Sequence, residues 1–149
     1  MASPGDRSCG ARFRGRPVHP ILTDFPIVMW TVSVLWDVIS LLWGGTAWAL
    51  FAFWSIAAGL VMSLPTIAAG LMEYFVMPRR GPAPRTAVLH AICMAGATLA
   101  FGASLFLRPA AGVSSLPSLL ASLAGLVLLG AGGWLGGELV FKFGIGRKE

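Results

Sequence analysis

The chain has 149 residues, of which 56% are hydrophobic and only 11% are charged, and its mean hydropathy is +0.79. A soluble domain carries about 25% charged residues, so this composition excludes an ordinary soluble globule and indicates a membrane protein. The net charge of +5 does not indicate nucleic-acid binding, because the basic residues stand in short segments between apolar runs and no nucleic-acid motif occurs.

The N-terminal segment is polar and basic. It carries Arg7, Arg12, Arg14 and Arg16 but no apolar core, so it resembles neither a cleaved signal peptide nor a lipoprotein leader. We therefore expect a basic, disordered arm over residues 1–17, a membrane domain over residues 18–143 and a short tail over residues 144–149.

Four apolar runs follow the arm. A helix needs about 20 apolar residues to cross a bilayer core of about 30 Å. The runs cover residues 26–43 (or 20–43 if the entry segment is helical), 48–75, 87–107 and 116–141, with glycine- and proline-rich breaks between them. The sequence predicts an all-α fold, an integral membrane four-helix bundle.

The distribution of basic residues predicts the orientation of this bundle. Of the 11 Lys and Arg residues, all but Arg108 fall in the arm, in the connection between the second and third spans, or in the tail. Since cytoplasmic segments are enriched in Lys and Arg, we expect both termini in the cytoplasm.

The segment before the first span is rich in proline. Pro17 and Pro20 restrict their own φ and the residue before them, so they favour an extended approach to the membrane. Thr23 or Asp24 would then cap a helix that begins near Pro26. This arrangement would fix the position of His19 over the end of the bundle at which the first span begins.

Five ionisable residues stand near one end of the spans. Placing a charge in lipid costs at least ~2.5 kcal/mol, so each of these residues needs either a stabilising partner or a functional role. Counting 1.5 Å per residue, antiparallel spans place Asp24, Glu73, His90 and Glu138 in one layer ~6–8 Å inside the charged boundary, close to His19. The alternatives are a helix cap for Asp24, interfacial ion pairs for the two glutamates, and a hydrogen bond from His90 to a neighbouring carbonyl.

Asp37 lies near the opposite end of the first span, about 9 Å deep at helical rise. Arg108 is the one cation within reach on that side. We expect Asp37 either to pair with Arg108 or to be protonated.

Glycines in the fourth span repeat at a spacing of four. Gly132 and Gly136 share one helix face, and Gly133 and Gly137 share another. Such a face favours close helix packing, and a flat cofactor could use the same space.

Two motifs carry a resemblance to a known family. The segments HPILTDFP (residues 19–26) and GGWLGGELV (residues 132–140), with a histidine at position 90, resemble a bacterial family of four-helix membrane proteins of unknown function. Some of its members are joined to a Rieske-type iron–sulfur domain. The resemblance implies a bacterial inner-membrane location and a redox association, with an iron–sulfur or other redox protein as partner. This chain departs from the pattern at Glu73, where an aspartate is expected, and its two cysteines cannot supply a cluster of their own.

Three functions are compatible with these residues. The first is redox-associated binding of haem b by His19 and His90, or of a divalent metal by His19, Asp24, Glu73, His90 and Glu138. The second is a non-catalytic membrane subunit or scaffold whose polar layer is structural. The third is a proton- or ion-handling protein, which four short spans without a repeat do not favour. No nucleophile–base pair or phosphate loop is visible, so we predict no independent catalytic activity.

Overall fold

The computed structural model describes residues 12–14, 16–77, 79–110 and 113–146. Two short strands, β1 (Arg12–Phe13) and β2 (Arg16–Pro17), pair in antiparallel fashion directly before the first helix. Residues 1–11 of the predicted arm and the last three residues of the tail lie outside the described residues.

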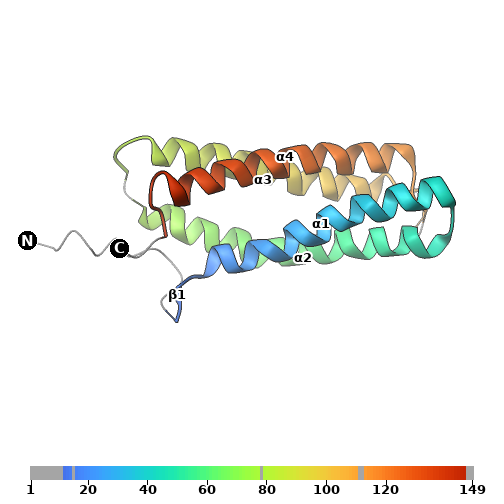
Figure 1. Cartoon of the computed structure of the whole chain (residues 1–149), viewed down its shortest axis with the longest axis horizontal. Coiled ribbons are helices and arrows are strands. Elements are labelled where there is room, and N and C mark those ends of the chain that lie inside the picture. The colour runs from blue at the N-terminus through green and yellow to red at the C-terminus, as the bar shows by residue number, and fades with distance from the viewer. Residues whose placement is uncertain (1–11, 15, 78, 111–112, 147–149) are drawn as a thin grey trace, which may run out of the picture.

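Four helices make up the rest of the described chain (Figure 1). They are α1 (Val18–Trp43), α2 (Thr46–Val76), α3 (Ala83–Phe106) and α4 (Leu116–Phe141). All four are long and apolar enough to cross a membrane. The predicted all-helical, four-span membrane fold is thus confirmed, and the predicted bounds of the fourth span match α4.

The helices run up and down, and consecutive helices are neighbours (Figure 1). α1 packs against α2 and α4, and α3 packs against the same two helices, so α1 and α3 lie diagonally opposite in the bundle. We call the end where α1 begins and α4 ends the terminal end. The other end, with the α1–α2 turn and the α3–α4 loop, is the loop end.

Glycine and serine set the connections at the loop end. Gly44 and Gly45 have φ values of 75° and 100°, which favour glycine, and they turn the chain from α1 into α2 within two residues. Ser115 caps α4 by accepting a hydrogen bond from the Ser118 amide, while the Ser118 hydroxyl accepts one from the Ser115 amide.

The entry to α1 is helical, as the alternative start at residue 20 anticipated, so the predicted extended approach and the cap near Pro26 are wrong. Pro20 lies in the first turn, where its missing N–H costs no hydrogen bond. Thr23 donates to the carbonyl of Pro20 at 2.7 Å, and Asp24 lies exposed on the helix surface. The prolines therefore start a helix, and His19 stands in its first turn.

An aromatic pair fills the middle of the bundle. The Trp30 and Phe101 rings, from the diagonal helices α1 and α3, stack at 4.9 Å with an interplanar angle of 12°. Each ring lies against a glycine of the adjacent helix, Gly59 on α2 and Gly125 on α4, where a Cβ atom would overlap it. These two glycines let the rings reach the centre of the bundle.

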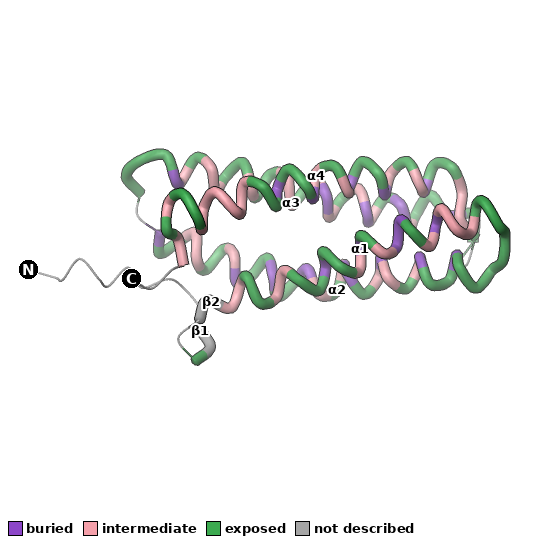
Figure 2. The backbone as a smooth tube through the Cα atoms, in the orientation of Figure 1, coloured by how far each residue is buried: buried purple, intermediate pink, exposed green. Residues whose placement is uncertain are grey.

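Burial is uneven along the helices. Buried segments lie mainly in the middle and toward the loop end, as Figure 2 shows, whereas half-buried and exposed segments dominate near the terminal end. Large apolar side chains cover the outside, among them Phe106, Trp134 and Phe141, which are each more than three-quarters exposed. Such a surface fits a lipid environment.

Candidate ligand site between two histidines

The two histidines of the chain, His19 and His90, come together across the bundle. His19 stands at the start of α1 and His90 in the second turn of α3, so they approach from diagonal helices at the terminal end. Their ring centroids are 6.3 Å apart and the ring planes are nearly perpendicular, at 88°. The sequence predicted this meeting, although not the helical placement of His19.

Each imidazole is held by a backbone carbonyl of its neighbouring helix. His19 Nδ1 lies 2.9 Å from the carbonyl oxygen of Thr66, and His90 Nδ1 lies 2.7 Å from that of Gly132. A carbonyl oxygen only accepts, so each Nδ1 carries the hydrogen and donates it. In the neutral ring the lone pair then sits on Nε2, and the described part of the chain places no hydrogen-bond partner on either Nε2.

Each ring also lies over a glycine. A Cβ atom at Gly70 would stand 2.9 Å from His19 Cε1, and one at Gly136 would stand 3.2 Å from His90 Cε1. Any side chain at these positions would push the imidazole away. We call the six residues His19, Thr66, Gly70, His90, Gly132 and Gly136 the histidine layer.

Two of the three predicted carboxylates, Asp24 and Glu138, lie at the surface. Asp24 is exposed, and Glu138 accepts a hydrogen bond from Lys142 at 3.1 Å on the exposed surface of α4. Glu73 is half-buried near the end of α2. In the described ranges no three His, Cys, Asp or Glu side chains group closely enough to hold a metal ion. The interfacial ion pair proposed as an alternative for Glu138 is therefore what the structure contains.

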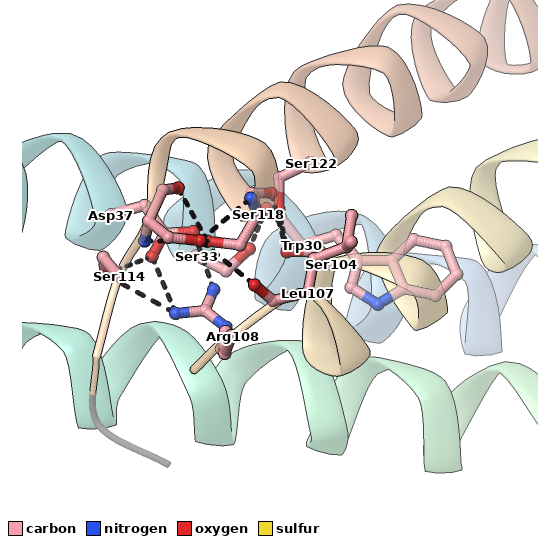
Figure 3. Close-up of polar contacts among 10 residues, drawn as sticks. Trp30, Ser33, Asp37, Ser104, Leu107, Arg108, Ser114, Ser118 and Ser122 are labelled. Atoms are coloured by element: carbon pink, nitrogen blue, oxygen red, sulfur yellow. Dashed lines mark hydrogen bonds and ion pairs between the residues drawn. The ribbon is translucent and has the colours of Figure 1, made fainter. Parts of the chain in front are cut away.

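A second polar cluster lies at the loop end (Figure 3). Arg108 donates through both terminal nitrogens to Asp37, at 2.9 Å to Oδ1 and 2.8 Å to Oδ2. Both side chains are essentially inaccessible, at 1% and 0% exposure. Ser114 adds a hydrogen bond of 2.6 Å to Oδ1. The predicted pairing of Asp37 with Arg108 is confirmed, as a bidentate buried ion pair.

Buried serines continue this cluster toward the middle of the bundle. Ser104 donates to the carbonyl oxygen of Ser118 at 2.8 Å, and Ser122 donates to Ser104 Oγ at 2.8 Å. All three side chains are fully buried. They join α3 to α4 and leave these hydroxyls satisfied within the protein.

Sequence reasoning missed part of the histidine layer. The acceptors for the two imidazoles are main-chain carbonyls, which any residue type supplies, so Thr66 and Gly132 gave no side-chain signal. A usable signal existed in spacing, because Gly70 follows Thr66 by four residues as Gly136 follows Gly132. From the sequence we interpret the glycines of α4 as packing space, without comparing their spacing with that of Thr66 and Gly70 in α2.

Comparison with known proteins gives one match. The chain matches a family described as "Predicted membrane protein (DUF2231)" over residues 15–149. No curated protein and no solved structure matches it.

Proposed function

The chain belongs to this family of predicted membrane proteins, and we propose that its histidine layer binds haem b between His19 and His90 in a small redox-associated membrane protein. The spacing of the two rings is the observation that carries the proposal. Two imidazole nitrogens bound to opposite sides of one metal ion lie roughly 4 Å apart, and each ring centre lies about 1 Å behind its nitrogen, which gives roughly 6 Å between centres. The observed separation is 6.3 Å.

The hydrogen bonds of the layer fit the same role. Metal-ligating histidines usually donate their other ring N–H to a carbonyl or carboxylate, which fixes the tautomer and makes the ligating nitrogen more basic. His19 and His90 both do this through Nδ1. Both rings therefore carry their lone pair on Nε2, as ligation requires.

The donor set favours haem over a bare divalent metal. A protein site for zinc, manganese or iron needs three or more side-chain ligands, and the described residues supply no such group. A haem brings its own equatorial nitrogens and takes two imidazoles as axial ligands. The chemistry it supplies when bound is one-electron transfer.

Small and half-buried residues surround the layer. Leu22, Cys93 and Met94, which lie about one turn from the histidines along α1 and α3, are half-buried. Gly70 and Gly136 keep side-chain atoms away from the two rings. A flat ligand in a helix bundle needs such small residues around it.

We also propose that the terminal end faces the cytoplasm of a bacterial inner membrane. Exposed basic residues at this end include Arg79, Arg80, Arg85 and Lys142, which is the pattern of a cytoplasmic face. A cofactor at this depth would exchange electrons with a redox protein on the same side, and an iron–sulfur protein is the partner class that the resemblance implies.

The test is an absorption spectrum of the purified protein, expressed with haem available. We expect a Soret band that shifts on reduction with dithionite and that is lost in both His19→Ala and His90→Ala, whereas the surface variant Glu138→Gln keeps it. A colourless protein that co-purifies with a stable partner would overturn the proposal and favour the structural-subunit alternative.

A further inference from the structure

The two halves of the bundle carry equivalent residues at equivalent places. Asp37 and Arg108 are 71 residues apart, and so are His19 and His90, Trp30 and Phe101, and Ser33 and Ser104. The last three pairs match in type or in chemistry, and in each of the four pairs both members have the same burial class. A constant offset over these positions means that α1 and α3 are in register with one another.

The same holds for α2 and α4, with an offset of 66 residues. Gly59 corresponds to Gly125 and Gly70 to Gly136, and each glycine of a pair lies under the ring from its own half. The offset is smaller because fewer residues separate the histidine from its acceptor in the second half: His19 and Thr66 are 47 residues apart, and His90 and Gly132 are 42 residues apart.

The contacts between the halves join equivalent residues. His19 meets His90 near the terminal end, Trp30 stacks on Phe101 in the middle, and Asp37 binds Arg108 at the loop end. Contacts between equivalent positions mark a twofold axis. Because α1 and α3 run in the same direction, this axis is parallel to the helices and so to the membrane normal.

We propose that the protein is a tandem duplication of a two-helix unit, and that the Asp37–Arg108 pair fixes the pairing of the two units. The expectation of four spans without a repeat is thereby corrected. Each unit contributes one histidine, one carbonyl acceptor and one glycine, so each unit supplies half of the histidine layer. The further statement that each unit supplies half of a ligand site rests on the proposed function. The duplication itself does not.

The axial ion pair distinguishes the correct partner from a wrong one. A unit carrying Asp at this position would meet a second aspartate if it paired with its own copy, and a unit carrying Arg would meet a second arginine. Two like charges in a buried, apolar environment repel strongly, whereas Asp37 and Arg108 attract. The surface that each unit presents at the axis therefore fits the other unit and rejects its own copy.

A charge exchange in the full-length chain tests the proposal. We expect Asp37→Arg and Arg108→Asp each to lower the thermal unfolding midpoint in detergent by roughly 10 °C or to prevent recovery of monodisperse protein. The double variant should recover at least half of the loss, because positions 37 and 108 are equivalent. Exchange of the surface pair, Glu138→Lys with Lys142→Glu, is the matched control. It should change the unfolding midpoint little in the single variants and in the double variant.

An exchange of the aromatic pair is the second arm, useful if the charge variants do not fold. Trp30→Phe leaves a void and Phe101→Trp overfills the core, while the double variant keeps both the volume and the stacking. We expect it to be more stable than either single variant. Double variants whose losses equal the sum of the single losses, in both arms, would overturn the claim that contacts between equivalent positions fix the pairing of the two units. Neither arm requires a bound cofactor, so loss of the Soret band leaves this inference standing.

Discussion

The two ends of the bundle use polar residues in opposite ways. At the loop end, Asp37 and Arg108 are buried and neutralise one another's charge through two hydrogen bonds. At the terminal end, His19 and His90 are half-buried, and each uses one ring nitrogen and leaves the other without a partner among the described residues. A charged group that is paired within the protein serves stability, and a ring nitrogen that keeps a free lone pair is available to a ligand.

The largest expected effect breaks the loop end. Asp37→Ala leaves the Arg108 guanidinium buried without its counter-charge, which should lower the free energy of unfolding by about 3–5 kcal/mol. Thermal and denaturant unfolding in detergent would measure it. A loss below about 1 kcal/mol would mean that the buried ion pair does not hold α1 against α3.

A smaller effect should follow from filling the space beside a histidine. Gly136→Ala places a Cβ 3.2 Å from His90 Cε1, so the ring must move, at a cost of about 1–3 kcal/mol and with weaker haem retention. Gly133→Ala is the matched control, because no atom lies within 4 Å of its added Cβ. Equal haem content in the two variants would show that the glycine is not part of the ligand site.

Removal of a histidine should separate stability from function. His19→Ala and His90→Ala each delete one hydrogen bond to a carbonyl, worth about 0.5–1.5 kcal/mol, so the apoprotein should remain folded. Circular dichroism and unfolding of the two variants would measure this. If these variants lost as much free energy of unfolding as Asp37→Ala, the histidines would serve the stability of the fold as the buried ion pair does.

The smallest effect belongs to the surface pair at the terminal end. Lys142 and Glu138 form an exposed i,i+4 ion pair, and such pairs contribute about 0.3–0.5 kcal/mol. Glu138→Gln should therefore leave unfolding almost unchanged, and 0.5 M salt should have a similarly small influence. A marked destabilisation would indicate that Glu138 is part of the polar layer that the sequence predicted.

The sequence predicts the helices well because lipid imposes a simple rule on length and hydropathy. It also offers Arg108 as a partner for Asp37, with a protonated Asp37 as the alternative, since a buried charge needs a partner and only one cation stands on that side. The sequence leaves the start of α1 open between residues 20 and 26, because prolines both end helices and begin them and the sequence alone does not distinguish the two for Pro17 and Pro20.

The internal repeat escaped the sequence analysis for a physical reason. At the axis, equivalent positions carry complementary rather than identical residues: Trp30 faces Phe101, and Asp37 faces Arg108. Because these contacting residues complement one another, the two halves differ in sequence at the positions that correspond most closely in structure. Among the residues that make these contacts, the histidines, a serine pair and the glycines keep the same residue type in both halves, and their offsets are evident once the contacts are known.

Electron paramagnetic resonance of the oxidised protein tests the central claim most directly, because it reports the axial ligands of a haem and the angle between their planes. We expect a low-spin ferric signal from two imidazoles, strongly anisotropic because the rings of His19 and His90 stand at 88°, and its loss in His90→Ala. A high-spin signal in the wild-type protein, or a low-spin signal that survives in His90→Ala, would contradict ligation by this pair.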